Sequence, residues 1–309
     1  MDLVFLGTPD FAVPTLERVV DAGHRVLAVY TQPDRPKGRG QETAFSPVKQ
    51  TALRLGLSVH QPERVRRTEV VEELGAMHVE VMVIVGYGQI IPQSILDLPP
   101  RGIINVHASL LPKYRGAAPI QWAIANGEAR TGVTTMKIDA GLDTGSMLLM
   151  DETEIGSEET APELSARLAD MGANLLVRTL SEIDTIVPEM QDDAEATYAP
   201  VLTKADGHID WTRPAAAISN RLRGFTPWPG AWTHFRGQIL HIHRTAMVRE
   251  RSGASPGTIL AAKRHLFVSC GEGTIIEVLD LQLEGRKRVS GEAFLNGQRL
   301  KENERLGDS

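Results

Sequence analysis

The sequence predicts an α/β fold with a mainly parallel sheet, followed by a smaller domain of β-strands. In the first half, short apolar runs of strand length alternate with amphipathic stretches of helical periodicity, a pattern typical of β-α-β units. In the last third, short strand-like runs are separated by Gly, Pro and Asn, which favours a small β-barrel or sandwich. A length of 309 residues suits two such domains.

Five apolar runs are the strand candidates of the first domain, at residues 3–7, 25–30, 81–85, 103–106 and 133–138. Between the first two, residues 11–20 place their apolar side chains on one helical face, and Gly23 follows as a C-terminal cap. Ser46 and Pro47 resemble an N-cap followed by the first residue of a helix, which we expect to end at Gly56.

A longer helix is expected over residues 162–183, and the acidic, proline-bounded segment 188–200 that follows lacks helical periodicity. Such a segment is typical of a connection between domains. We therefore divide the chain into a first domain, a linker and a second domain, at residues 1–188, 189–205 and 206–309. Strands of the second domain are predicted at residues 232–235, 239–243, 257–261, 266–269 and 274–283.

The charge of the chain is unevenly distributed. The formal net charge is −6, but residues 204–309 carry 16 Lys and Arg against 11 Asp and Glu, a net of +5, and the remainder carries −11. A basic region attracts phosphates, although an excess of this size is also common on solvated surfaces.

A single cysteine, Cys270, excludes an internal disulfide and any Cys-rich metal centre. We therefore expect a protein of a reducing compartment, the cytoplasm. The first residues lack the basic segment and apolar core of a signal peptide, and no apolar run reaches the roughly 18–20 residues that span a bilayer. No association with a membrane is expected.

The first predicted strand ends at Gly7, where a dinucleotide-binding domain begins its glycine-rich turn. Residues 7–11 are Gly-Thr-Pro-Asp-Phe, so the second and third glycines of that motif are missing, and the sequence GxxxxGK[ST] is also absent. His241 and His243 lie on a predicted strand without a third ligand, which favours a surface strand, and we expect no metal. A ligand is still expected beyond the carboxyl ends of the parallel strands.

Polar side chains with complementary chemistry lie where two predicted strands end. Asn105 and His107 are alternate residues of one strand and so point to the same side of the sheet, and Asp143 follows the strand at 133–138 in a glycine-rich turn. An amide stabilises a developing oxyanion, an imidazole exchanges protons near neutral pH, and a carboxylate orients an imidazole. Each residue alone is more often a structural or turn residue. Together they predict acyl or carbonyl transfer without a metal.

Residues 105–112 (Asn-Val-His-Ala-Ser-Leu-Leu-Pro) and 114–121 (Tyr-Arg-Gly-Ala-Ala-Pro-Ile-Gln) resemble the signature of the 10-formyltetrahydrofolate-dependent formyltransferase family. The Asp-Thr-Gly sequence at 143–145 is similar as well. Four further segments are similar to the branch of this family that acts on methionyl-tRNA, at residues 7–11, 31–40, 209–211 and 225–229. The resemblance covers nearly the whole chain and is weakest in the linker and after about residue 253.

The resemblance implies a Rossmann-like first domain that carries the active site and an OB-like β-barrel that binds tRNA. It implies that the amino group of methionyl-initiator tRNA attacks the formyl carbon of 10-formyltetrahydrofolate, giving N-formylmethionyl-tRNA for translation initiation. In this reaction Asn105, assisted by His107, holds the oxyanion, while Asp143 orients His107 and helps to remove the amine proton. A monomer is also implied.

The resemblance places the folate along Ser109, Leu110, Leu111 and Pro112 and beside the backbone of Gly86, Tyr87 and Gly88. The polar segment 31–45 is unusually long for a connection between a strand and a helix. Its residues 31–40 are similar to the tRNA-recognition loop of the family, so the acceptor stem is expected at Arg35, Lys37 and Arg39, with discrimination by Arg39.

Two other functions remain open on the sequence alone. A small-molecule formyltransferase or a formyl-folate hydrolase shares the Asn, His and Asp residues but has no need of a basic barrel. A non-catalytic tRNA-binding protein binds tRNA but releases no tetrahydrofolate when it is given both substrates. An assay with Met-tRNA and a labelled formyl donor distinguishes the three functions.

Overall fold

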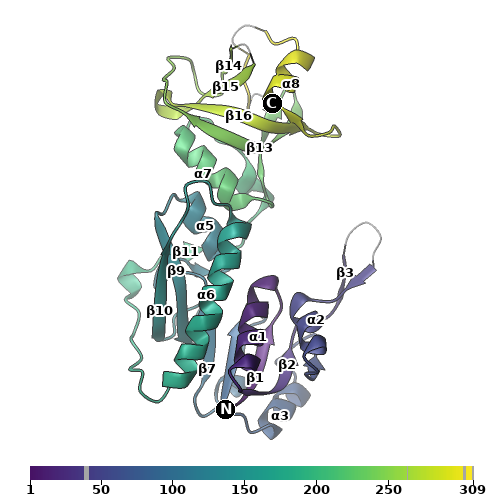
Figure 1. Ribbon diagram of the computed structural model, residues 1–309, viewed down its shortest axis with the longest axis vertical. Helices are drawn as coiled ribbons and strands as arrows, with labels where there is room; N and C mark the ends of the chain where they lie inside the picture. Colours follow the sequence, from purple (N-terminus) through teal and green to yellow (C-terminus); the bar gives the residue numbers. More distant parts are fainter. Residues whose placement is uncertain (38–41, 263, 302–303, 308–309) are drawn as a thin grey trace. The chain divides into compact units, whose positions relative to one another are not determined.

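The computed structural model describes residues 1–37, 42–262, 264–301 and 304–307, and the chain divides into two units (Figure 1). The first unit contains Met1–Pro119, Arg130–Glu154 and Ser165–Ala199. The second contains Ile120–Ala129, Ile155–Leu164 and Pro200–Ser309. In the described part of the chain, no helix has the length and apolar character needed to cross a membrane.

A seven-stranded sheet forms the centre of the first unit, in the order β10-β9-β7-β6-β1-β2-β5. Its parallel strands are β1 (Asp2–Gly7), β2 (Arg25–Tyr30), β5 (Val59–His60), β6 (Val81–Val85) and β7 (Ile103–His107). Two antiparallel strands extend it, β9 (Arg130–Lys137) and β10 (Met147–Glu154). The predicted α/β class with a mainly parallel sheet is confirmed.

Helices cover both faces of this sheet because its central strands are apolar on both sides. Leu3 and Phe5 of β1 pack in one core with α1 (Val13–Asp21), α2 (Pro47–Arg54) and α6 (Ala161–Glu182), and Figure 1 shows α1 and α6 on the same face. Val4 and Leu6 pack in the opposite core, with α3 (Thr68–Ala76) and α4 (Gln93–Leu96). The alternation along β1 therefore divides the first unit into two hydrophobic layers.

Most predicted helix boundaries lie within a few residues of those observed. Ser46 caps α2 as predicted, since its Oγ accepts a hydrogen bond of 3.1 Å from the Lys49 amide, and Gly56 has a φ of +70°. The first predicted helix is divided, because Asp10–Ala12 forms a 3₁₀ turn and α1 begins only at Val13.

Two strands differ from the prediction. The strand at 103–106 includes His107, and the strand predicted at 133–138 begins at Arg130 and ends at Lys137. The sequence analysis did not identify β10, because its apolar run, Met147–Met150, is only four residues long and is followed by four polar residues at the edge of the sheet.

Segments that the sequence leaves without structure contain short strands. Within residues 31–45, β3 (Arg35–Lys37) and β4 (Glu42–Ala44) form a hairpin, and Arg39 lies outside the described residues. In the segment predicted as a connection, a 3₁₀ turn (Asp193–Glu195) precedes β11 (Tyr198–Ala199). β11 pairs in parallel with β8 (Arg115–Gly116), so this part of the segment belongs to the first unit.

The second unit contains an antiparallel sheet in the order β12-β13-β16-β15-β14, which curls as a half-barrel. Its strands are β12 (Ala231–Phe235), β13 (Gln238–Val248), β14 (Ile259–Ala262), β15 (His265–Ser269) and β16 (Ile275–Leu283), with β17 (Val289–Ser290) paired to β16. The helices are α5 (Pro119–Ala125), α7 (Ala215–Phe225) and α8 (Gly291–Gly297), and two 3₁₀ turns span Lys204–Gly207 and Gly271–Gly273. Ile218 of α7 and Phe294 of α8 enter its core. The predicted strands are confirmed, whereas the sequence analysis did not identify α5, α7 or α8.

Candidate active site

Strand β7 places Asn105 and His107 on one side of the sheet. Ile104 and Val106 point into the core beneath α1 and α6, so the two residues that alternate with them point to the opposite face. Asn105 is paired with Met136 of the antiparallel neighbour β9, and both polar side chains are buried. Among the residues that the structure describes, the side-chain amide of Asn105 makes no hydrogen bond, which leaves the N–H groups of this side chain available to a ligand.

The two ring nitrogens of His107 have different surroundings. Nε2 lies 2.9 Å from the carbonyl oxygen of Tyr114, and Nδ1 lies 3.7 Å from Oδ2 of Asp143. Because a carbonyl oxygen only accepts, Nε2 carries a proton and donates it to this hydrogen bond. Nδ1, on the Asp143 side, is therefore the nitrogen that is available for proton exchange.

The Asp143 carboxylate is held in place by the backbone of a second loop. The amide of Gly116 donates a hydrogen bond of 2.9 Å to Oδ2, the same oxygen that faces His107. Asp143 has a φ of +53°, a left-handed conformation that is uncommon for a residue other than glycine. The structure thus brings Asp143 together with His107, beside the Asn105 position on the same strand.

The residues predicted to bind folate after β7 form a loop that is attached to β9. Ser109 and Leu111 are buried, while Leu110 and Pro112 are half-buried. Thr134 of β9 donates through Oγ1 to the Ser109 carbonyl at 2.7 Å and accepts from the Leu111 amide at 3.3 Å. These bonds fix the backbone of the loop next to the strand end that carries His107.

The loop after β6 is fixed by its backbone and by a buried ring. Gly86 and Gly88 have φ values of +57° and +83°, and the carbonyl between them accepts hydrogen bonds of 3.1 Å from Thr8 and Gln32. The Tyr87 side chain is buried in the core, where desolvation raises its pKa to about 12. The phenol of Tyr87 therefore packs in the core, so the predicted folate contact of this loop concerns its backbone.

The predicted tRNA loop is the β3–β4 hairpin, and its base carries an ion pair. The Asp34 carboxylate binds the Lys49 ammonium and accepts a hydrogen bond of 2.8 Å from Nε2 of Gln61. These two partners lower the pKa of Asp34, with Lys49 the larger cause. Arg35 is exposed on β3, and Lys37 ends that strand.

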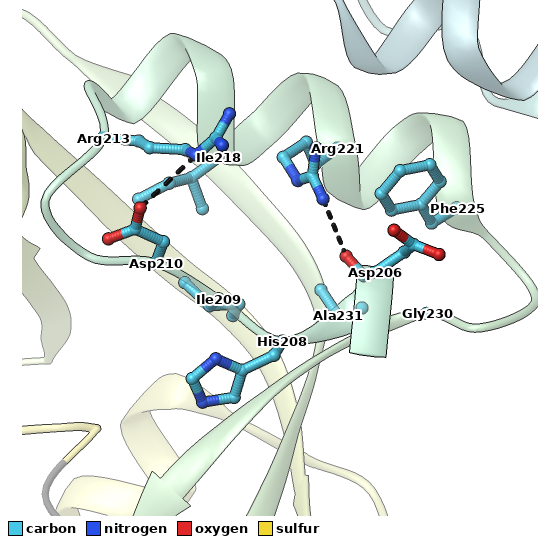
Figure 2. Close-up of a pocket in the computed structure, with 11 residues that line it drawn as sticks. Asp206, His208, Ile209, Asp210, Arg213, Ile218, Arg221, Phe225, Gly230 and Ala231 are labelled. Atoms are coloured by element: carbon cyan, nitrogen blue, oxygen red, sulfur yellow. Dashed lines mark hydrogen bonds and ion pairs between the residues drawn. The ribbon is translucent and has the colours of Figure 1, made fainter. Parts of the chain in front are cut away.

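Two cavities formed by described residues of the second unit include no residue that the sequence predicts for catalysis or folate binding. Figure 2 shows the first, where Arg221 reaches across to the carbonyl oxygen of Asp206 at 3.0 Å and Arg213 pairs with Asp210 at 3.5 Å. Burial lowers the pKa of Arg221, whose guanidinium also lies over the Phe225 ring. Through these contacts the polar groups that line this cavity bind to one another.

Sequence reasoning missed residues that contact the loops of the site. Gln191 donates hydrogen bonds of 2.8 Å to the carbonyl oxygens of Asp143 and Gly145, and Thr197 accepts one of 2.9 Å from the Tyr114 amide. Both lie in the acidic segment that the sequence analysis assigned to an interdomain connection. No periodicity or motif in that segment signals these contacts, because they depend on its position in the fold.

Comparison with known proteins identifies the family. The formyl transferase model matches residues 1–180, and the model of the formyl transferase C-terminal domain matches residues 201–299. The chain is 66% identical over 310 residues to the methionyl-tRNA formyltransferase of Solibacter usitatus, which covers 100% of this chain and 99% of the relative. It is 56% identical over 310 residues to the methionyl-tRNA formyltransferase of Koribacter versatilis, at 99% coverage of both chains.

Two solved structures share the fold at lower identity. The N-formyltransferase of Helicobacter canadensis, in complex with folinic acid and dTDP-3-aminofucose, has a TM-score of 0.66 at 19% identity, over 89% of this chain and 98% of that chain. The sugar 3N-formyl transferase WlaRD, in the presence of dTDP and 5-N-formyl-THF, has a TM-score of 0.67 at 18% identity, over 93% and 99%. The family models and the full-length relatives, taken with the fold, show that this chain belongs to the formyl transferase family, in its methionyl-tRNA formyltransferase branch.

Proposed function

We propose that Asn105, His107 and Asp143 carry out formyl transfer from 10-formyltetrahydrofolate to the amino group of methionyl-initiator tRNA. Enzymes of this branch formylate Met-tRNA with formyl-tetrahydrofolate, and this chain is an enzyme of that type. The observation that carries the residue assignment is the 3.7 Å approach of Asp143 to Nδ1 of His107. The strand of His107 also carries Asn105, whose side-chain amide has no hydrogen bond to the residues that the structure describes.

The three side chains suit the charges that develop in the reaction. The amine nitrogen attacks the formyl carbon, and the former carbonyl oxygen becomes an oxyanion to which the Asn105 amide donates. The amine loses its proton to the His107–Asp143 pair, directly or through water, and Nδ1 is the ring nitrogen on that side. The carbon–nitrogen bond to the folate then breaks, and the folate nitrogen takes up a proton as tetrahydrofolate leaves.

The loops around this strand end suit a folate substrate. A Cβ at Gly86 would lie 2.9 Å from Cγ of Pro9, so this loop keeps its path only with glycine. The Ser109–Pro112 backbone, tied to Thr134, lies beside the same strand end. We assign the folate to these two loops, with its formyl group at the Asn105 amide.

The β3–β4 hairpin and the basic second unit are the parts of the chain that we assign to tRNA. Arg35 and Lys37 are on the hairpin, and in the assignment Arg39 meets the acceptor stem. In the second unit, Arg286 and Lys287 are exposed, and no salt bridge within the described part of the chain engages them. Because RNA binding by such cations releases counterions, we expect tRNA affinity to fall steeply with salt.

The proposal treats residues 1–188 as the catalytic domain and residues 206–309 as the tRNA-binding domain, joined by residues 189–205. One chain supplies Asn105, His107 and Asp143, so the proposed unit of activity is a monomer. Because translation takes place in the cytoplasm, we assign an enzyme that acts on aminoacylated tRNA to this compartment.

The test is a formylation assay with purified protein, Met-tRNA and 10-formyltetrahydrofolate carrying a labelled formyl group. We expect one labelled formylmethionyl group for each tetrahydrofolate released, and no product with uncharged tRNA. Tetrahydrofolate release without labelled tRNA would instead indicate a hydrolase. Binding of tRNA without turnover would indicate a non-catalytic protein, and either result contradicts the proposal.

A further inference from the structure

We infer that Gln191 and Arg115 are positioning residues that hold the Asp143 carboxylate against His107. The inference rests on the function proposed above, because it assigns these residues an effect only through Asp143. The hydrogen bonds of the two side chains go to each other, to Asp193 and to the loop that carries Asp143, and both residues lie outside the three that we assign to catalysis.

Gln191 fastens the loop that carries Asp143. Its Nε2 donates two hydrogen bonds of 2.8 Å, one to the carbonyl of Asp143 and one to the carbonyl of Gly145. The loop needs this attachment because Asp143 itself occupies a left-handed conformation, which is unfavourable for a residue other than glycine and persists only when neighbouring contacts impose it. The side-chain amide of Gln191 therefore holds two carbonyl groups of the loop that carries the carboxylate facing His107.

Arg115 fixes the orientation of that amide. Its Nε donates a hydrogen bond of 2.9 Å to Oε1 of Gln191, and its Nη2 binds Asp193 at 2.8 Å. The Arg115 side chain is only 2% exposed, whereas that of Asp193 is 85% exposed, so Arg115 is a buried cation whose charged partner comes from the surface. Since Arg115 only donates, Oε1 of Gln191 must face it and Nε2 must face the Asp143 loop.

The same segment supports the other side of His107. Thr197 accepts a hydrogen bond of 2.9 Å from the Tyr114 amide through Oγ1, and its carbonyl accepts one of 2.9 Å from the Arg115 amide. The Tyr114 carbonyl is the acceptor for Nε2 of His107. Residues 191–199 thus hold the groups on both sides of the imidazole, the Asp143 carboxylate through Gln191 and the Tyr114 carbonyl through Thr197.

The test replaces Gln191 with methionine, which has a similar volume but donates no hydrogen bond. We expect kcat to fall about 10- to 100-fold, the scale of a misplaced catalytic group, with the KM for each substrate changed less than threefold. The matched control is Gln93→Met, which removes an exposed hydrogen bond to Asp97 at the start of α4 and should leave kcat unchanged. Melting temperatures measured for both variants separate a folding defect from a positioning defect.

A second variant covers the case in which methionine disturbs the fold. Gln191→Glu keeps an acceptor for Arg115 but sets an oxygen against the carbonyls of Asp143 and Gly145, so it should lose at least as much kcat as Gln191→Met. Wild-type kcat in the glutamate variant would overturn the inference. We also expect the pH profile of kcat to change shape in both variants, whereas a general loss of folded enzyme lowers the profile without moving its inflections.

A double-mutant cycle with Asp143→Asn separates this inference from the proposed active site. If Gln191 acts through Asp143, Gln191→Met has no further effect on kcat in the Asp143→Asn background. If Asp143→Asn slows the reaction but the fold reductions in kcat of the two substitutions multiply in the double variant, the positioning role is wrong. The proposed active site is then still supported. If Asp143→Asn itself retains kcat within threefold, the proposed active site fails, and this inference fails with it.

Discussion

Nε2 of His107 donates its hydrogen bond to the carbonyl oxygen of Tyr114, at 2.9 Å, and not to the Asp143 carboxylate. In many His-based sites the carboxylate receives the proton of the ring nitrogen remote from the reaction. Here a backbone carbonyl accepts the Nε2 proton, and Asp143 lies on the same side of the ring as Nδ1, the nitrogen to which we assign proton exchange. The carboxylate is therefore placed to share the proton that the attacking amine loses.

The Asn105 amide is expected to contribute to the rate and little to stability. Asn105→Ala should lower kcat about 10²- to 10³-fold, because removing one oxyanion donor typically costs that much. The melting temperature should change little, since the amide has no hydrogen-bond partner among the described residues. Steady-state kinetics and thermal unfolding of the variant check both statements, with the exposed Asn174→Ala as a control. A kcat within threefold of the wild type would contradict the oxyanion role.

Gly172 allows α6 to pack closely on β7, and a larger side chain there should destabilise the fold. A Cβ at this position would lie 2.7 Å from Cγ1 of Val106. Alanine raises helix propensity by about 1 kcal/mol, but overpacking a core costs about 1–3 kcal/mol, so Gly172→Ala should lower the free energy of unfolding. Chemical denaturation measures this change. In a Val106→Ala background, which removes the colliding methyl group, the same substitution should become neutral or stabilising.

The strand pattern predicts that the three candidate site residues come together, because periodicity and position along the sheet are enough to place them. Asn105 and His107 share a face through simple alternation along β7, and Asp143 follows from the end of β9. Gln191 and Thr197 do not follow from any local pattern, because their partners are about 46 to 83 residues away in the chain. The β3–β4 pairing does not follow from a local pattern either, because residues 31–45 are mostly polar and contain no apolar run of strand length.

The base of the β3–β4 hairpin is expected to control the affinity for tRNA. Asp34→Asn removes the charge that binds Lys49 while it keeps the side-chain shape, so the KM for Met-tRNA should rise several-fold and kcat should stay the same. The lowered pKa of Asp34 means that this ion pair is complete above about pH 4, the ordinary pKa of an Asp. Its contribution to stability is present there and is lost as the pH falls through the lowered pKa.

The prediction for the hairpin is checked by measuring the steady-state kinetics of the wild-type and Asp34→Asn proteins from pH 6 to 8. The ratio of their KM values for Met-tRNA should be constant over this range, because Asp34 stays ionised throughout. A ratio that varies with pH, or a loss confined to kcat, would show that the ion pair acts on the chemical step and not on the hairpin.

Cys270 is expected to resist thiol reagents in the folded protein. Its side chain is buried in the core of the second unit, and desolvation raises its pKa to about 12. At pH 8 only about 10⁻⁴ of such a thiol is ionised, and the thiolate is the reactive form. Labelling with a chromogenic disulfide should therefore be slow for the native chain and complete within the mixing time in guanidinium chloride. Rapid native labelling would show that this part of the core opens readily.

Arg286 and Lys287 should account for part of the salt dependence of tRNA binding. Replacing both with glutamine removes two exposed cations that have no salt bridge within the described residues, and each phosphate contact contributes about 0.7–0.9 to the slope of log affinity against log salt. We expect the slope to fall by about 1–2, with kcat at saturating Met-tRNA unchanged. The matched control replaces Arg244 and Arg288, both of which pair with Asp280 at 3.0 Å. Because that carboxylate already neutralises part of their charge, the control should change the slope less, and an equal change in both variants would show that net charge alone attracts the tRNA.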